Sequence, residues 1–195
     1  MSTSREGPSA ELAELIKTRS VQIGSFKLAS GRRSSYYIDA RRATMSAQGL
    51  ELIGDLGLRA IRAAGWWPAY VGGLTLGADP VAHAIALASR RAPPELDAFT
   101  VRKEPKGHGT GQPIEGCLRE GASVVVVEDV VTTGASALKA IKAVTRAKSH
   151  VLGVLAIVDR EEGGREAIEA AGYSLQALLS LRDLGLPPQL PDATR

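Results

Sequence analysis

The sequence predicts an α/β fold with a central, mostly parallel β-sheet that is flanked by helices. From residue 69 onward, short apolar segments alternate with segments of helical periodicity. The apolar segments are nearly continuous runs, such as the four valines at 124–127, which is typical of strands buried on both faces. The chain has 195 residues, which is enough for one well-buried domain and too few for two of full size.

The first 45 residues break this alternation and predict a small hood on the sheet. Residues 9–19 have helical periodicity and follow Pro8. In FKLASGRRSSYYID, residues 26–39, two short strand-like runs flank a Ser/Gly/Arg turn, which predicts a hairpin. Because no linker, repeat or low-complexity segment divides the chain, we predict a single domain. It has a hood at about 1–45, an α/β core at about 46–180 and an irregular tail at 181–195.

The core is predicted to alternate between strands and helices. Strands are expected at 69–71, 95–101, 123–127, 151–158 and 175–179. Helices are expected at 46–64, 80–90, 136–147 and 165–171. The segment RKEPKGHGTGQP, residues 102–113, has three glycines and two prolines and is expected to form no regular element.

Composition and charge exclude several kinds of protein. The formal charge is only +3 and no long Lys/Arg run is present, so a small anionic ligand fits better than a nucleic acid. Cys117 is the only cysteine, which excludes an internal disulfide, and no Cys/His spacing suits zinc. No signal peptide or membrane span is apparent. We therefore expect a cytoplasmic protein with no metal ligands of its own and no nucleic-acid or membrane partner.

An acid pair follows the strongest predicted strand. In VVVVEDVVTTGAS, residues 124–136, Glu128 and Asp129 come directly after four valines, and the carboxyl ends of parallel strands are where ligands bind in such folds. Carboxylates only accept hydrogen bonds, which suits the hydroxyls of a ribose. The small residues that follow lead into a helix N-terminus, which favours a phosphate. The predicted phosphate loop consists of Val130, Val131, Thr132, Thr133, Gly134, Ala135 and Ser136.

This string of residues resembles the signature by which type I phosphoribosyltransferases bind phosphoribosyl diphosphate (PRPP). Three other segments are similar to orotate phosphoribosyltransferases within that superfamily: the basic loop at 102–113, the hairpin at 26–39 and VDREEGGRE at 158–166. The likeness covers about residues 20–170. It departs from the family pattern at Ala29 and in GGLTLGADP, residues 72–80, where family members often carry lysines.

The resemblance implies a type I phosphoribosyltransferase fold and an activity in de novo pyrimidine biosynthesis. The 5-phosphoribosyl group of PRPP would be transferred to orotate, giving orotidine 5′-monophosphate and pyrophosphate. It implies Mg²⁺, bound mainly through PRPP, and a homodimer in which the loop of one subunit reaches the site of the other.

The resemblance also implies roles for individual residues. Glu128, Asp129 and the phosphate loop would bind PRPP, and Asp129 would also stabilise the sugar cation. The loop cations would bind the diphosphate and act in catalysis, with Lys106 as the main candidate: Arg102, Lys103, Lys106 and His108. Orotate would contact Thr132, Tyr37, Ile38 and Arg160, whose planar fork can hold a carboxylate through two hydrogen bonds.

Two alternative functions remain open on the sequence. One is a phosphoribosyltransferase for another base, such as a purine, and the other is a regulator of the same fold that senses PRPP or a nucleotide without catalysis. The basic loop argues against a sensor, because a sensor needs no cations over a leaving group. Arg160 and the hairpin favour orotate among the bases.

Overall fold

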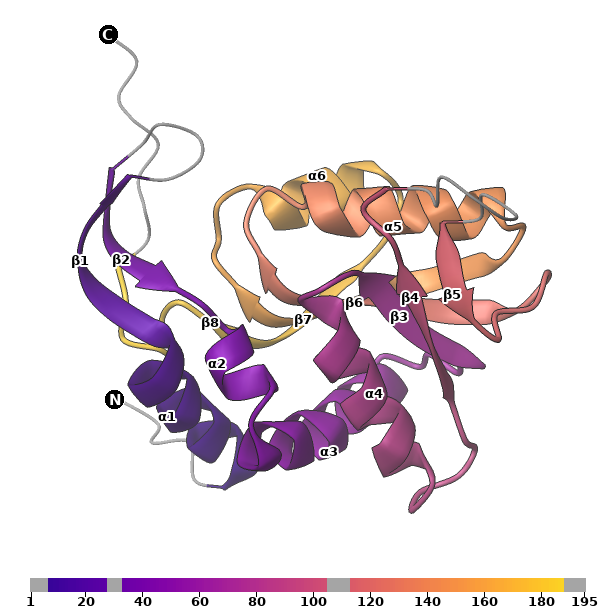
Figure 1. The fold of residues 1–195 in the computed structure, drawn as a ribbon, viewed down its shortest axis with the longest axis horizontal. Coiled ribbons are helices and arrows are strands. Elements are labelled where there is room, and N and C mark those ends of the chain that lie inside the picture. The colour runs from indigo at the N-terminus through magenta and orange to yellow at the C-terminus, as the bar shows by residue number, and fades with distance from the viewer. Residues whose placement is uncertain (1–6, 28–32, 105–112, 188–195) are drawn as a thin grey trace, which may run out of the picture.

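The computed structural model describes residues 7–27, 33–104 and 113–187, and a six-stranded β-sheet forms its centre (Figure 1). Its strands lie in the order β5-β4-β3-β6-β7-β8. They are β3 (Tyr70–Leu74), β4 (Asp97–Val101), β5 (Ile114–Gly116), β6 (Ser123–Val131), β7 (His150–Asp159) and β8 (Leu175–Ser180). All neighbours pair in parallel except β5, which is antiparallel to β4. The predicted α/β class with a mostly parallel sheet is therefore confirmed.

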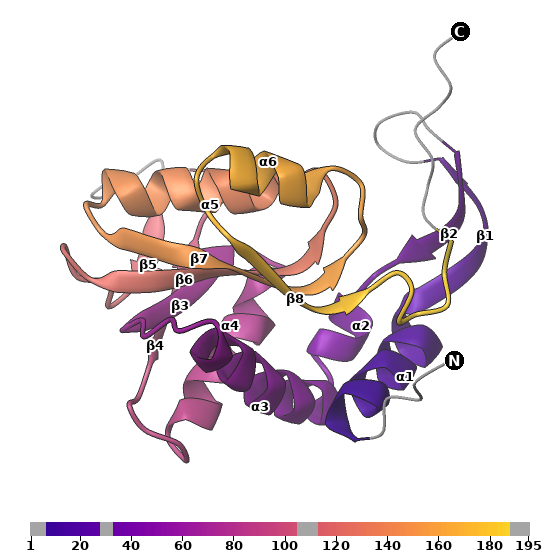
Figure 2. The ribbon, with the colours of Figure 1, turned by 180° about the vertical axis from the view of Figure 1, so that it is seen from behind.

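Helices cover both faces of this sheet (Figures 1 and 2). On one face lie α3 (Ala47–Ala63) and α4 (Ala78–Ser89), and on the other lie α5 (Ala135–Arg146) and α6 (Gly164–Ala170). The valine run explains how this works, because Val125 and Val127 belong to the apolar cluster on one face and Val124 and Val126 to the cluster on the other. A continuous apolar run is thus what a strand buried on both sides requires.

The hood consists of α1 (Pro8–Ser20), an antiparallel pair of strands and a short helix, α2 (Arg41–Thr44). The strands are β1 (Val21–Lys27) and β2 (Arg33–Ile38), as the hairpin pattern predicts. The sequence gives no sign of α2, because four residues are too few to show a helical period. Side chains of α1 and β2, including Leu12, Ile16 and Tyr36, share one apolar cluster with the sheet, which favours a single folding unit.

The tail is more closely attached than its irregular sequence suggests. Leu181, Leu184 and Leu186 form turns after β8 and are buried in the cluster that joins the hood and the sheet. The hydroxyl of Tyr36 donates to the carbonyl of Pro187 at 3.2 Å. The division of the chain into hood, core and tail stays a prediction. Within the described residues, no helix is both long and apolar enough to cross a bilayer.

The predicted end of β6 is wrong, and the error concerns the acid pair. Instead of ending at Val127, the strand continues to Val131, so Glu128 and Asp129 lie inside it. The reason is that β7 continues to pair with β6, with Glu128 opposite Ala156 and Val130 opposite Val158. On the other side β3 pairs only with residues 124–126. The last part of β6 therefore extends beyond its pairing with β3. The two acids lie on this part, where β6 has a neighbouring strand only on the β7 side.

The prediction also missed β5, which follows the basic segment. Three residues, Ile114–Gly116, pair with Val101, Thr100 and Phe99 at the edge of the sheet. The backbone N–H of Arg102 donates to the carbonyl of Pro113 at 2.7 Å, so the two ends of the basic loop lie together. Within that loop, residues 102–104 form no helix or strand, as expected, and 105–112 lie outside the described residues.

Candidate functional site

The carboxyl groups of Glu128 and Asp129 lie together where β6 passes the end of β3. Their side chains are hydrogen-bonded to each other, and Asp129 Oδ1 also accepts from the backbone N–H of Val130 at 2.9 Å. Asp129 lies against Gly77 at the start of α4, where an added Cβ would be 2.4 Å from Oδ1. Glu128 is buried, and its Oε2 has no hydrogen-bond partner among the described residues.

Burial determines the charge of this pair. Desolvation, together with the neighbouring charge of Asp129, raises the pKa of Glu128 from 4.5 to about 9. Burial also raises the pKa of Asp129, although the Val130 N–H and the Glu128 hydrogen bond act in the other direction. In the free protein at neutral pH, Glu128 therefore holds a proton that it shares with the Asp129 carboxylate. With Glu128 protonated, the pair carries less negative charge than two carboxylates, and Glu128 Oε2 has no partner among the described residues.

The phosphate loop connects β6 to α5 next to these acids. A cavity of about 50 Å³ is lined by Glu128 and by residues 130–137, which include every predicted member of the loop. Gly134 is the N-cap of α5 and has the left-handed backbone conformation, with φ 77°. The first N–H groups of α5 face this loop, and their partial positive charge favours a phosphate. The structure thus brings the predicted loop and Glu128 around one small, polar hollow.

Replacing Gly134 with alanine is expected to raise the KM for PRPP and to destabilise the fold by about 1–2 kcal/mol, since an L-residue is strained at this φ. An added Cβ would also lie 2.9 Å from the carbonyl oxygen of Gly164, so the loop must shift. The matched control is Gly172→Ala, because Gly172 has a φ of 89° with no atom near the added Cβ. Thermal unfolding and PRPP kinetics of both variants check this. Equal KM values would show that the loop geometry is unimportant.

The guanidinium of Arg160 is buried between the sheet and the hood. It lies 5.4 Å from the centre of the Tyr36 ring and 2.7 Å from Glu162, which is itself buried. Its Nη2 makes the ion pair with Glu162, whereas its Nε has no hydrogen-bond partner among the described residues. The arginine is thus held in place while part of its hydrogen-bonding capacity stays unused, as a site for a planar anion would require.

Three neighbouring residues of β2, Tyr36, Tyr37 and Ile38, differ in their environment. Tyr36 is buried and stacks on Arg160, so its ring faces are already in use. Ile38 is buried in the main apolar cluster, which leaves its backbone as the part that could contact a ligand. Tyr37 is 39% exposed and lies beside Phe26, with 5.8 Å between ring centres. Tyr37 is therefore the accessible aromatic side chain of the strand.

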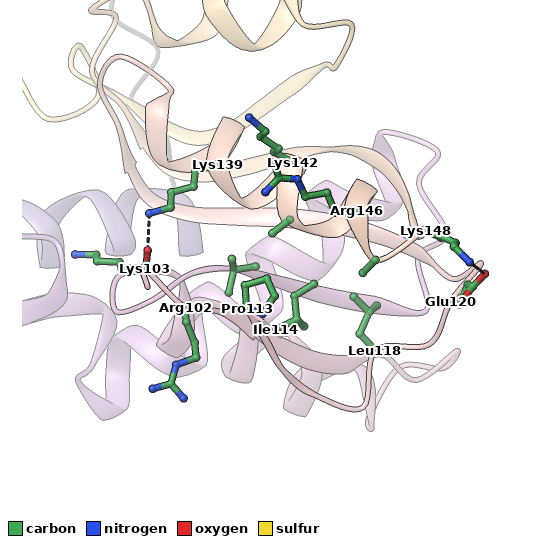
Figure 3. A pocket seen from close by; sticks show the side chains of 13 residues that line it. Arg102, Lys103, Pro113, Ile114, Leu118, Glu120, Lys139, Lys142, Arg146 and Lys148 are labelled. Atoms are coloured by element: carbon green, nitrogen blue, oxygen red, sulfur yellow. Dashed lines mark hydrogen bonds and ion pairs between the residues drawn. The ribbon is translucent and has the colours of Figure 1, made fainter. Parts of the chain in front are cut away.

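The described cations of the basic loop separate at its base (Figure 3). Arg102 pairs with Glu115 of β5 at 2.8 Å, whereas Lys103 extends in another direction and lies within electrostatic range of Glu128. The Nζ of Lys139 on α5 donates to the backbone carbonyl of Lys103 at 2.6 Å and so holds this end of the loop. Lys106 and His108 lie outside the described residues. Of the four predicted loop cations, the structure thus places Lys103 toward the acid pair.

The sequence did not predict two features of the site, which are the positions of Arg41 and Asp79. Arg41 of α2 forms two hydrogen bonds with Asp39, at 2.8 and 3.2 Å. Burial raises the pKa of Asp129, and the charge of Arg41 is one of the influences that oppose this rise. Asp79 in the first turn of α4 accepts from Thr75 at 2.7 Å and from Thr100 at 2.8 Å, which ties the glycine-rich segment to β4. A second basic pair directly after the hairpin, at 41–42, was the available signal for Arg41.

Among the residues that the structure describes, no group of three or more His, Cys, Asp or Glu side chains could hold a metal ion. The oxygen atoms of the acid pair are nevertheless of the kind that Mg²⁺ prefers, and Glu128 Oε2 is without a partner. The residues present are therefore compatible with a magnesium ion that arrives bound to a phosphorylated ligand.

Comparisons with known proteins were made for the whole chain. No family model matches it. An orotate phosphoribosyltransferase of Rhodopirellula baltica is 46% identical over 183 residues, which cover 92% of this chain and 95% of that protein. One of Mycobacterium avium is 51% identical over 176 residues, which cover 90% and 96%. The crystal structure of the Mycobacterium tuberculosis orotate phosphoribosyltransferase in complex with PRPP is similar with a TM-score of 0.78 and 45% identity, over 92% of this chain and 100% of that one.

Proposed function

Because this chain belongs to the orotate phosphoribosyltransferase family, we propose that its acid pair and phosphate loop bind PRPP for transfer of the 5-phosphoribosyl group to orotate. The products are orotidine 5′-monophosphate and pyrophosphate, and the reaction belongs to pyrimidine biosynthesis. The observation that carries the proposal is the position of Glu128 and Asp129 beside the phosphate loop, at the open end of β6. In a ribose 5-phosphate, the hydroxyls can donate to the two carboxyl groups, and the phosphate can accept from N–H groups of the loop.

PRPP contacts three parts of this site. Its 5-phosphate lies in the hollow of residues 130–136, where N–H groups at the start of α5 and the Thr132, Thr133 and Ser136 hydroxyls can donate. Its ribose hydroxyls donate to Glu128 and Asp129. Its diphosphate extends toward Lys103, with Arg102, Lys106 and His108 as the further loop cations. Arg41 adds a positive charge on the hood side. It replaces part of the positive charge that family members have from lysines at the positions of Ala29 and residues 72–80.

Orotate lies between the hood and the end of β7. The Arg160 fork holds the carboxylate of the base, Tyr37 and the backbone of Ile38 line the hood side, and Thr132 lies between the base and the phosphate loop. The buried Nε of Arg160, which has no partner among the described residues, supports this arrangement, since a buried guanidinium is costly until an acceptor completes its hydrogen bonds.

Catalysis requires charge to be stabilised at both ends of the breaking bond. As the bond from C1′ of the ribose to the diphosphate breaks, the sugar becomes a cation, which the Asp129 carboxylate stabilises, and the diphosphate gains charge, which the loop cations neutralise. N1 of the pyrimidine then bonds to C1′ from the opposite side, with inversion, and its proton is released to the departing pyrophosphate or to water. Mg²⁺ bound to PRPP supplies further neutralisation of the diphosphate.

A spectrophotometric assay tests this function. In the presence of Mg²⁺ and PRPP, we expect consumption of orotate and no consumption of uracil, adenine or hypoxanthine, and removal of Mg²⁺ with a chelator should abolish turnover. Turnover of a purine in place of orotate would assign the protein to another base. Binding of PRPP without turnover of any base would indicate a sensor.

Replacing Arg160 with lysine is expected to raise the KM for orotate by about 10–100-fold, because a lysine keeps the charge and loses the two-pronged hydrogen bond. The KM for PRPP should change little. The matched control is Arg165→Lys, since Arg165 pairs with Asp159 at 3.0 Å on the neighbouring turn. Steady-state kinetics with each substrate varied in turn check this. An equal rise of both KM values would mean that Arg160 supports the fold and not the base.

We extend the proposal to a homodimer in which the basic loop serves the neighbouring subunit, and to a cytoplasmic location, which the single cysteine favours. Mixing the inactive variants Lys106→Ala and Asp129→Asn tests the shared site. Hybrid dimers would contain one site with both an intact loop and an intact acid pair. Recovery of up to about a quarter of the wild-type activity is expected for random mixing, whereas no recovery would place each loop over its own site.

A further inference from the structure

A second cavity lies apart from the acid pair, between the outer side of α5 and the edge strand β5 (Figure 3). Its volume is about 750 Å³. That size is within the ~300–1,000 Å³ range of sites for small organic ligands. Neither Glu128 nor Asp129 nor any residue of the phosphate loop lines it. The proposed PRPP site shares with this cavity only Arg102 and Lys103 at the base of the basic loop, and the rest of the cavity has no role in the catalytic proposal.

One side of the cavity is a row of cations from α5. Lys139, Lys142 and Arg146 follow one another at helical spacing on the side of α5 that is turned away from the buried Ile141 and Val144. No acid occurs in α5, and among the described residues neither Lys142 nor Arg146 has an ion pair or hydrogen bond for its side chain. Glu120, the acid in the lining, pairs with Lys148 at 2.9 Å, so the row of α5 cations attracts a ligand with several negative charges.

The opposite side is apolar. Pro113 and Ile114 at the start of β5, together with Leu118, form a wall that faces the α5 cations across the cavity (Figure 3). Ala143 and Ala147 line the floor between them without filling it. An inorganic polyphosphate would use only the cations, and an apolar ligand only the wall. A ligand that carries a flat ring and a chain of phosphates uses both.

We propose that this cavity is a second binding site, which takes a nucleoside triphosphate with its base on the wall of Pro113, Ile114 and Leu118 and its phosphates on Lys139, Lys142 and Arg146. The site is placed to influence the reaction, because Lys139 also holds the Lys103 carbonyl at the base of the catalytic loop. Arg102 and Lys103 border both sites, but the acid pair and the phosphate loop line only the PRPP site, so that both ligands bind at once.

Calorimetric titration of ATP into the full-length protein, saturated with PRPP and Mg²⁺ and without orotate, tests the site. ATP is expected to bind despite the PRPP, and the double variant Lys142→Ala/Arg146→Ala should weaken it about tenfold. The matched control is Lys17→Ala/Arg19→Ala, which removes one lysine and one arginine from the last turn of α1. Equal affinity of the two double variants would overturn the proposal. Loss of ATP binding in the presence of PRPP would overturn it as well, since ATP would then occupy the PRPP site.

Inorganic tripolyphosphate distinguishes a nucleotide site from a site for any polyanion. It should bind more weakly than ATP, and Leu118→Ala should weaken ATP while leaving tripolyphosphate unchanged. Equal affinity for ATP and tripolyphosphate would show that the apolar wall contributes nothing and would overturn the nucleotide assignment. Turnover of orotate without ATP should be the same in both double variants. The ATP titration measures binding and needs no turnover of orotate. A protein that lacked the proposed catalytic function would still show ATP binding, so the two failures are distinguishable.

Discussion

Lys106→Ala is expected to lower kcat by about 10²–10³-fold, which is the effect of removing one donor aimed at developing charge. Lys106 lies outside the described residues, and its expected role comes from the loop that carries it. The ends of that loop are held together by the bond from Arg102 N to Pro113 O, and its start is held on α5 by Lys139. Lys103 at this start already lies near Glu128. The resemblance of this basic loop to that of the family assigns Lys106 to the leaving diphosphate.

The measurement is steady-state turnover of orotate with PRPP at saturation, together with thermal unfolding. We expect the melting temperature to be unchanged, because the proposed role of Lys106 is to bind the diphosphate of PRPP. Lys148→Ala is the control, since this exposed lysine pairs only with Glu120 at 2.9 Å, far along the chain from the loop. A Lys106→Ala enzyme with near-normal kcat would refute the assignment, and the leaving-group role would pass to His108, Arg102 or Lys103.

Glu128→Gln is expected to stabilise the folded protein increasingly as the pH rises from about 4.5 to about 9. In the folded protein, Glu128 keeps its proton up to the raised pKa of about 9. In the unfolded chain, the same carboxyl group loses its proton near pH 4.5. The stability that this proton contributes is complete below the lower value and is lost as the pH approaches the upper one. At about 1.4 kcal/mol per pH unit, the variant gains at most ~3 kcal/mol at pH 7. Glutamine preserves the hydrogen bond that the protonated acid donates to Asp129.

Thermal unfolding of both proteins across this pH range checks the prediction, with Glu51→Gln on the exposed face of α3 as the control. A constant difference between the variant and the wild type would mean that Glu128 is ionised in the folded protein. Binding gives a second readout. If ribose hydroxyls donate to a Glu128 carboxylate, PRPP must release a proton near neutral pH, and its affinity should rise from pH 7 to pH 9. Calorimetry in buffers of different ionisation enthalpy measures the released proton directly, and Glu128→Gln should abolish it.

The acid pair shows how far the residues alone lead. Four valines, two acids, two threonines and a glycine predict a buried strand, a polar strand end and a helix start, and each part is found in that order. The position of the strand end was predicted wrongly, because two charges look like the end of a buried strand. The strand continues because β7 supplies partners for it on one side. No pattern in residues 124–136 contains that information.

The hood and the edge of the sheet make the same point. The hairpin was predictable from its alternating strands and its turn, but α2 with Arg41 is one turn long and has no periodicity. Likewise, β5 has three residues and exists only because β4 offers it an edge. Arg160 was predicted as a planar fork just past a strand end, and it does follow β7; only the structure shows that it is buried against Tyr36 and paired with Glu162. Tyr36 is far from Arg160 in the sequence, and Glu162 meets it only because the chain turns directly after β7.

The sequence by itself determined the α/β class, the order of the main elements, the acid pair and the phosphate loop, since these depend on neighbouring residues and on short periods along the chain. Only the tertiary structure decided that Glu128 holds its proton, that Lys103 faces the acids while Arg102 pairs with Glu115, and that a basic cavity opens behind α5. These properties depend on which surfaces lose water and which charges meet. Both are consequences of contacts between segments that the chain brings together only by folding.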